Sequence, residues 1–216
     1  MALLYNQLHE LFNSIRRFHF PFEGEIEQIP MNGVYLIFEA GEKYWDWDRI
    51  VRVGTHTGNN QLRSRLYQHF LMQNKNRSIF RKNIGRCLLN KVNNPYLEKW
   101  DLDTTSSADK LKNGHLIDRD VENKYEILIS NYIQENLSFS VFKVDSKEER
   151  IIWESRIIST LAAFQNVCPS KDWLGHSSPK EKIKKHGLWQ VNELGNQQLN
   201  LNEFNKLKEV VLAGHH

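Results

Sequence analysis

The sequence predicts an α+β fold in which a small antiparallel sheet of three strands is flanked by helices. Residues 33–39 and 50–54 are short runs rich in β-branched and aromatic side chains, and they lie close enough in the chain to pair as a hairpin. Residues 138–145 alternate apolar and polar side chains, which indicates a third strand. We expect residues 1–216 to form one domain around this sheet, since the length suits a single domain.

Helical patterns surround and separate the three strands. Apolar residues recur there at three- to four-residue spacing, as they do in amphipathic helices. The predicted helices cover 2–17, 61–72, 78–91, 120–136, 147–163, a short basic segment between Pro179 and Gly187, and 202–212. Residues 40–48 and 92–118 are expected to be loops. Residues 167–216 contain the last two of these helices and form a C-terminal extension.

The charges of the chain are distributed unevenly. The net charge is only +3, yet no Asp or Glu occurs between Asp48 and Glu98. That stretch contains Arg49, Arg52, Arg63, Arg65, Lys75, Arg77, Arg81, Lys82, Arg86 and Lys91. Cations without nearby counter-charges attract a polyanion. We therefore expect contact with nucleic acid; the alternative is an ordinary basic face in contact with solvent.

Neither cysteine chemistry nor a membrane is expected to define this protein. Cys87 and Cys168 lack the spacing of zinc ligands and are interpreted as two buried thiols in a reducing cytoplasm. The N-terminal residues lack the basic start and the long apolar core of a signal peptide. No apolar run approaches the ~20 residues of a membrane span. These features favour a cytoplasmic protein without membrane association.

Glu154 lies in the middle of the apolar stripe of the helix predicted at 147–163. A carboxylate in that position has to be desolvated, paired or bound to a cation, because an isolated buried charge is too costly. Two interpretations stay open. Glu154 forms an ion pair with an arginine, or it is a functional group that holds a metal or moves a proton.

The helix predicted at 61–72 carries a second candidate pair. Arg65 and His69 are four residues apart, so they share one face of this helix at the edge of its apolar side chains. A guanidinium at the rim of a core holds a phosphate oxygen with two hydrogen bonds. The simpler interpretation is an exposed helix with a lone histidine.

The order of these features resembles that of the GIY-YIG nuclease family. The segments that carry the resemblance are GVY at 33–35, RVG at 52–54, RLYQH at 65–69 and WESRIISTLAAFQN at 153–166. The first two stand for the motifs that name the family. The third is similar to its helix with Arg and His, and the fourth to its Glu-containing helix with an Asn about a dozen residues later. The resemblance covers residues 32–72 and 138–166, which makes 73–137 a basic helical insertion between the family's first helix and its third strand.

The resemblance implies a metal-dependent endonuclease that hydrolyses phosphodiester bonds in DNA. By analogy with the family, Glu154 ligates Mg²⁺ or Mn²⁺, and Arg65 stabilises the charge that develops on the scissile phosphate. His69 positions a phosphate or a water, and Tyr35 orients or deprotonates the attacking water. Asn166 supports the side chains of the site without binding the substrate itself. The resemblance also implies that these side chains converge in one open cleft.

One residue departs from the family pattern. Arg52 occupies the position of the tyrosine in the second motif, and an arginine cannot accept a proton. Three interpretations stay open, in this order of preference. His56 is the general base, since an ordinary pKa of about 6.5 suits that role; Tyr35 acts alone; or activity is lost. The first interpretation places His56 in the same cleft.

The acid-free stretch supplies candidate contacts to the nucleic acid. These are Arg52, Arg63, Lys75, Arg77, Arg81, Lys82 and Arg86, and the last four are expected to extend a positive surface beside the cleft. DNA is the expected partner, RNA stays open as an alternative, and a homodimer is compatible with the sequence. The additional segments suggest a restriction-like enzyme, or one associated with defence or with a mobile element.

Two other classes of protein compete with the nuclease interpretation. The first is a catalytically inactive nucleic-acid-binding module on the same fold, which the presence of Arg52 supports. The second is a protein-interaction domain, in which Glu154 and Arg65 form a structural ion pair.

Overall fold

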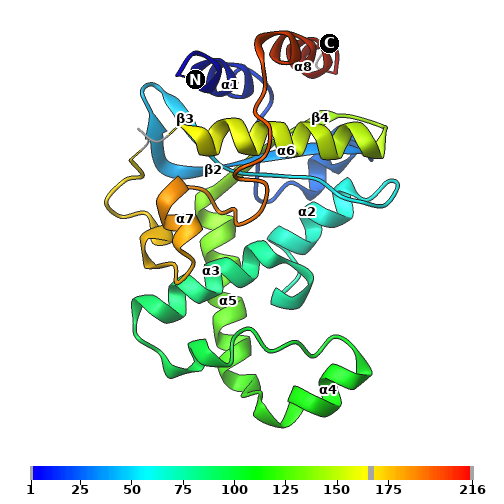
Figure 1. Ribbon diagram of the computed structural model, residues 1–216. Helices are drawn as coiled ribbons and strands as arrows, with labels where there is room; N and C mark the ends of the chain where they lie inside the picture. Colours follow the sequence, from blue (N-terminus) through cyan, green and yellow to red (C-terminus); the bar gives the residue numbers. More distant parts are fainter. Residues whose placement is uncertain (1, 165–167, 215–216) are drawn as a thin grey trace.

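The computed structural model describes residues 2–164 and 168–214, and Figure 1 shows their arrangement. The helices are α1 (Ala2–Asn13), α2 (Leu62–Phe70), α3 (Ile79–Lys91), α4 (Ser107–Asn113), α5 (Arg119–Asn136), α6 (Lys147–Ala163), α7 (Glu181–His186) and α8 (Leu201–Ala213). The strands are β1 (Phe18–His19), β2 (Gly33–Tyr44), β3 (Trp47–Gly54) and β4 (Leu137–Lys143). Short 3₁₀ helices cover Glu23–Gln28, Lys75–Arg77, Pro95–Glu98, Gly114–Leu116 and Leu174–Ser177.

The strands form an antiparallel sheet in the order β1-β4-β2-β3. β2 lies in its middle, with Tyr35 opposite Gly54 of β3 on one side and opposite Val141 of β4 on the other. The predicted antiparallel sheet of three strands is confirmed. A short fourth strand, β1, pairs Phe18 with Phe139 at the outer edge of β4. Two residues carry no periodicity, so the sequence gives no sign of this strand.

The connection between β2 and β3 is a tight turn. β2 continues to Tyr44, which lies opposite Trp47 at the start of β3. Trp45 takes a positive φ of 54° in the turn, and its ring stacks on those of Tyr44 and Trp47, with centroid separations of 5.8 and 6.4 Å. The loop expected at 40–48 is therefore wrong. Aromatic residues favour strands, and here they outweigh the polar residues of the same stretch.

Helices cover both faces of the sheet, so β2 is buried on both sides. Val34, Leu36 and Phe38 point into a core shared with α1, α6 and α8, whereas Tyr35 and Ile37 point into a core shared with α2, α3 and α5. In Figure 1, α6 lies on one side of the sheet, α3 and α5 lie on the other, and α4 lies at the far end of the molecule. The alternation along β2 therefore places Tyr35 on the face of α2 and α3.

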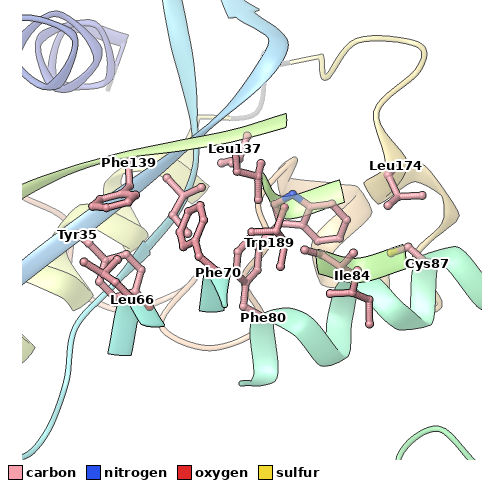
Figure 2. Packing of buried hydrophobic residues seen from close by; sticks show 14 of the residues in the cluster. Tyr35, Leu66, Phe70, Phe80, Ile84, Cys87, Leu137, Phe139, Leu174 and Trp189 are labelled. Atoms are coloured by element: carbon pink, nitrogen blue, oxygen red, sulfur yellow. The ribbon is translucent and has the colours of Figure 1, made fainter. Parts of the chain in front are cut away.

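The C-terminal extension is tied to the edge of the sheet. Trp189 N–H donates to the carbonyl of Val51 on β3 at 2.7 Å. The buried carboxylate of Glu39 on β2 accepts the indole N–H groups of Trp173 at 3.0 Å and Trp189 at 2.8 Å, and the hydroxyl of Tyr132 on α5. Figure 2 shows Trp189 packed among the side chains of the sheet and α3. A buried carboxylate needs such donors, so this one side chain links β2, α5 and the extension.

Residues 92–118 are more regular than expected. They contain the 3₁₀ helices Pro95–Glu98 and Gly114–Leu116, and the helix α4. At the start of α4, Ser106 Oγ accepts the Asp109 N–H at 3.0 Å. α4 has this cap but no buried residue, so it lacks the apolar period that reveals longer helices.

The other predicted helices are confirmed with small differences in their bounds. α6 covers the predicted range, and α1 ends at Asn13 instead of residue 17. The Asn13 side-chain amide donates to the carbonyls of His9 at 2.8 Å and Asp48 at 3.0 Å, and it thereby joins the end of α1 to β3. Over the residues described, no helix has the length and apolar character that crossing a membrane requires.

Candidate active site

A buried chain of hydrogen bonds starts from the tyrosine of the first motif. The Tyr35 hydroxyl on β2 and His69 Nε2 on α2 share a hydrogen bond of 2.7 Å. His69 Nδ1 lies 2.7 Å from Ser78 Oγ, which also caps α3 by accepting the Arg81 N–H at 3.2 Å. Tyr35 and His69 are only 1% and 0% exposed. Three elements therefore fix this pair and shield it from bulk solvent.

His69 is neutral in these surroundings. Burial lowers its pKa well below the ordinary 6.5, and the positive charges of Arg65, Arg52 and Arg81 lower it further. A neutral imidazole has one donor and one acceptor nitrogen. His69 can therefore hydrogen-bond the Tyr35 hydroxyl through Nε2 and the Ser78 hydroxyl through Nδ1, without placing a charge in the core.

Gly54 of the second motif makes room for Tyr35 of the first. A Cβ at Gly54 would lie 2.2 Å from the Tyr35 hydroxyl oxygen, far closer than van der Waals contact. The two residues lie directly opposite each other in the sheet. A glycine is needed here because another group approaches the backbone closely, so the two motifs are physically coupled.

We expect Gly54→Ala to lower the free energy of unfolding by about 1–3 kcal/mol, because the new methyl group forces Tyr35 to move within a packed core. Urea unfolding followed by circular dichroism measures this change. Gly24→Ala is the matched control, since a Cβ there meets no atom within 4 Å. Equal stability of the two variants would show that the close approach of Tyr35 does not constrain this position.

Glu154 on α6 reaches the same end of the sheet. Its Oε1 accepts the Thr55 N–H at 3.1 Å, directly after β3, and Thr55 Oγ1 donates to the Gly33 carbonyl at 2.7 Å at the start of β2. Burial raises the pKa of Glu154, whereas the positive charges of Arg52 and Arg65 oppose that rise. The half-buried carboxylate is thus held at the ends of both motif strands and lies within the field of two arginines.

Arg65 lies where α2 approaches the start of α3. Its Nη1 donates to Gln68 Oε1 at 3.1 Å and to the Arg77 carbonyl at 3.0 Å. Within the described residues no ion pair joins its guanidinium to Glu154. Its positive charge nevertheless lowers the pKa values of both Glu154 and His69. The half-exposed Arg65 guanidinium is therefore near Glu154 and His69 but forms no direct ion pair with the Glu154 carboxylate.

His56 is buried beside the sheet, and both of its ring nitrogens are engaged. The Gly33 N–H donates to Nε2 at 3.3 Å, so the proton lies on Nδ1, which donates to the Gly58 carbonyl at 2.8 Å. Burial lowers the pKa of His56, and the nearby charge of Arg150 acts in the same direction. The ring joins the loop after β3 to the start of β2, and in this arrangement it offers no free lone pair to a water.

Arg52 shares a sheet face with Tyr35, because it lies opposite Ile37 in the register of β2 and β3. It is buried, and its Nη1 donates to the Trp189 carbonyl at 2.5 Å and to Gln190 Oε1 at 3.3 Å. Both acceptors belong to the C-terminal extension, for which the sequence predicts no role in the site. Arg52, which replaces the tyrosine of the second motif, is thus fixed by hydrogen bonds to residues that belong to none of the family motifs.

The candidate DNA contacts fall into a buried group and an exposed group. Lys75, Arg81 and Arg86 are buried and form ion pairs with Glu122, Glu126 and Asp101 at 2.9, 2.6 and 2.6 Å, respectively. Arg77 is exposed and Lys82 is half-buried, whereas Arg63 bonds both carboxylate oxygens of Glu27 at 3.0 Å. The expected surface from Arg77 to Arg86 is therefore interrupted. Arg81 and Arg86 turn inward because their acidic partners come from beyond the acid-free stretch.

Several neighbours of the site were not predicted from the sequence. Thr55 acts through its backbone N–H, which no side-chain pattern reveals. Ser78 occupies a helix N-cap, a position that the sequence does signal. Trp189 and Gln190 are distant in sequence from every motif. Asn166, the remaining predicted site residue, lies outside the described residues.

The donor set fits a hard divalent cation in a site that the substrate completes. The Thr55 bond is the single hydrogen bond to the Glu154 carboxylate among the described residues, so an oxygen remains for a cation. No group of three or more His, Cys, Asp or Glu side chains gathers in the part of the chain described. Mg²⁺ is commonly held by one or two carboxylates together with waters and substrate phosphates. One half-buried carboxylate suits that mode and does not make a preformed cage.

Comparison with known families agrees with this geometry. The family model described as GIY-YIG domain matches residues 1–215. The class that the fold and the match define is a nuclease-type domain that acts on nucleic acid. The chain belongs to the GIY-YIG family, whose members are generally endonucleases, so the predicted family is confirmed. No curated protein and no solved structure matches the chain in the corresponding comparisons.

Proposed function

We propose that this protein is a metal-dependent endonuclease that hydrolyses phosphodiester bonds in DNA. The observation that carries the proposal is that one strand and two helices bring four side chains to one end of the sheet. These are Tyr35 from β2, Arg65 and His69 from α2, and Glu154 from α6. They join a carboxylate that is free to bind a cation, a guanidinium without an acidic partner among the described residues, and a phenol bonded to a neutral imidazole. A purely structural cluster would be expected to pair the two opposite charges directly.

Arg65 binds the phosphate in this proposal. Its guanidinium has no carboxylate partner among the described residues, so its N–H groups are available to phosphate oxygens, where they stabilise developing negative charge. Arg52 contributes a second positive charge on the Tyr35 face. Glu154 would hold Mg²⁺ or Mn²⁺, and when bound such a cation stabilises charge on the phosphoryl and leaving oxygens. Asn166 is proposed to support this arrangement, as in the family.

Tyr35 is the general base that the contacts favour. Its hydroxyl is bonded to His69, which keeps the oxygen oriented and is neutral at rest, so the phenol proton passes to His69 as Tyr35 takes a proton from water. Because the pair is almost fully buried, it would act on a single ordered water and not on bulk solvent. His56, the preferred base from the sequence, would first have to release the Gly33 N–H from Nε2. A role for His56 therefore requires the loop after β3 to rearrange when the substrate binds.

The wider setting of the enzyme is proposed on the same basis. DNA is the proposed substrate, with RNA as the alternative, and the protein is proposed to act in the cytoplasm without a membrane. The insertion at 73–137 and the extension at 167–216 are additions to one nuclease domain. They suit a restriction-like enzyme or one that serves defence or a mobile element, and a homodimer is one arrangement in which it would act.

A catalytically inactive nucleic-acid-binding module is the second candidate. The observation that favours it is the substitution of Arg52 for the tyrosine of the second motif, together with the near-complete burial of Tyr35. Cleavage assays with Mg²⁺ on supercoiled, linear and branched DNA separate the two candidates. The enzyme proposal predicts strand breaks in at least one of them. DNA binding without breaks under any metal would favour the inactive module.

Exposed Arg77 and half-buried Lys82 allow a test of DNA binding. Arg77 carries the backbone carbonyl that Arg65 bonds, and Lys82 lies one turn into α3. We expect Arg77→Gln combined with Lys82→Gln to weaken DNA binding and to reduce the slope of log affinity against log salt, by about one unit for each phosphate that the variant no longer binds. Fluorescence anisotropy over a salt series measures this slope.

The matched control for that double variant is Lys206→Gln with Lys208→Gln, on the exposed side of α8. The control should keep the slope of the wild type, because α8 packs against the opposite face of the sheet from α2 and α3. An equal decrease of slope in both double variants would mean that binding depends on overall charge and that the insertion does not bind phosphate specifically.

A further inference from the structure

The chain that follows α7 lies along the outer edge of β3. The Trp189 N–H donates to the Val51 carbonyl at 2.7 Å, as a neighbouring strand would. The Trp189 ring is fully buried, and its Nε1 donates to Glu39 Oε2 at 2.8 Å. A backbone bond to β3 and a side-chain bond to β2 therefore fix this segment relative to the two motif strands.

This segment supplies the hydrogen bonds that hold Arg52. Nη1 of Arg52 donates to the Trp189 carbonyl at 2.5 Å and to the amide oxygen of Gln190 at 3.3 Å. The guanidinium also lies over the Phe80 ring, 5.0 Å from its centroid. Arg52 and Gln190 are 6% and 7% exposed. Arg52 Nε is buried and has no hydrogen-bond partner among the residues described.

A buried N–H without a partner costs free energy unless a substrate satisfies it. Arg52 lies on the Tyr35 face of the sheet, and its Phe80 neighbour packs edge-on against His69 with ring centroids 5.6 Å apart. Its positive charge is also the strongest charge acting on the pKa of Glu154. The guanidinium is therefore close to both His69 and Glu154, beside the place where the scissile phosphate is proposed to bind.

We propose that Gln190 is a positioning residue for the reaction. Its amide oxygen, together with the Trp189 carbonyl, orients Arg52 so that the unpartnered side of the guanidinium meets the scissile phosphate. This inference rests on the proposed function of the site. It makes the C-terminal extension part of the catalytic arrangement and gives Arg52 a phosphate-binding role in place of the missing tyrosine.

The chemistry of the two acceptors supports this assignment. A carbonyl and an amide oxygen both accept from a guanidinium while leaving its charge intact, whereas a carboxylate would neutralise that charge and compete with phosphate. The sequence offers carboxylates elsewhere for buried arginines, as the ion pair of Arg81 with Glu126 shows. At Arg52 the two acceptors are neutral, which suits a cation that is reserved for an anionic ligand.

A double-mutant cycle between Gln190 and Arg52 tests the proposal. The variants are Gln190→Met, which keeps the chain length and removes the acceptor, Arg52→Met, and their combination, with circular dichroism used to confirm folding. Gln197→Ala is the matched control, an exposed glutamine of the same segment. We measure single-turnover cleavage with Mg²⁺, and affinity for a short DNA duplex in EDTA.

We expect Gln190→Met to slow cleavage by about tenfold at saturating DNA, which is the scale of removing a hydrogen bond to a charged group. It should add nothing once Arg52→Met is present, because it acts through Arg52. Gln190→Glu should instead lower the salt slope of binding by about one unit, because its carboxylate would neutralise Arg52 and release one phosphate. Gln197→Ala should match the wild type.

Two results would overturn the proposal. One is wild-type behaviour of Gln190→Met in both assays; the other is an effect of Gln190→Met that is undiminished in the Arg52→Met background. If the wild type cuts no DNA, the proposed function fails, and the same cycle is then decided by affinity in EDTA alone. In that case, positioning by Gln190 is supported if Gln190→Met lowers the affinity for DNA in the wild-type background but not in the Arg52→Met background. It is overturned if Gln190→Met lowers the affinity equally in both backgrounds, or in neither.

Discussion

Glu154→Gln is expected to remove DNA cleavage, with a decrease on the order of 10³-fold or more, and to leave DNA binding nearly intact. Glutamine keeps the size of the side chain and one acceptor oxygen for the Thr55 N–H, but it lacks the charge that holds a hard divalent cation. The positive groups that are proposed to bind phosphate do not depend on that charge. Single-turnover cleavage and anisotropy in EDTA measure the two properties separately.

Glu149→Gln is the control for this variant, because Glu149 lies on the exposed first turn of the same helix. It should cut as fast as the wild type. Affinity of Glu154→Gln for DNA should persist or rise, since one negative charge leaves the neighbourhood of the phosphate. If Glu154→Gln cuts at the wild-type rate, Glu154 is a structural residue and the catalytic assignment is wrong at its centre.

Tyr35→Phe is expected to slow cleavage by about 10²–10⁴-fold, the range that general acid–base groups contribute. Phenylalanine fits the space beside Gly54 but removes the oxygen that bonds His69 Nε2. Tyr67→Phe is the matched control, since Tyr67 is an exposed tyrosine on α2. Rates at saturating metal, measured over a pH series on both sides of neutrality, report the effect on the chemical step.

The same pH series distinguishes Tyr35 from His56 as the base. If His56 accepted the proton, His56→Ala would slow cleavage most near neutral pH, and hydroxide would partly replace the imidazole at high pH. The hydrogen bonds of His56 to Gly33 and Gly58 instead lead us to expect lower stability and a decrease in rate that changes little with pH. A full rate for Tyr35→Phe would exclude the tyrosine as the base.

The elements that a periodic pattern defines were predictable. α6 matches its predicted range because its apolar stripe and its cap signals agree: Ser146 Oγ accepts the Glu149 N–H at the N-cap, and acidic residues fill the first turn. The strand that carries Tyr35 was predictable from its composition, but the near-complete burial of Tyr35 and His69 was not, since the resemblance implied an open cleft. The sequence did not predict short or polar elements such as β1 and α4, because they have too few residues to display a period.

The charges beside the site were harder to predict. An acid-free stretch suggests exposed cations, but Arg81 pairs with Glu126 of α5, 45 residues later in the chain. A linear pattern does not reveal which distant acid will meet a given base, because that depends on how the helices pack. The same reason hides the contacts of Trp189 and Gln190 with Arg52, which exist only once the extension lies against β3.

The measurement that tests the nuclease assignment most directly is cleavage of a supercoiled plasmid by the purified wild type and by Glu154→Gln, each with Mg²⁺ and with EDTA. We expect nicked or linear plasmid for the wild type with Mg²⁺ alone, and intact plasmid under the other three conditions. The assignment would be contradicted if the wild type bound the plasmid but left it intact with Mg²⁺ and with Mn²⁺, or if both proteins cut it equally.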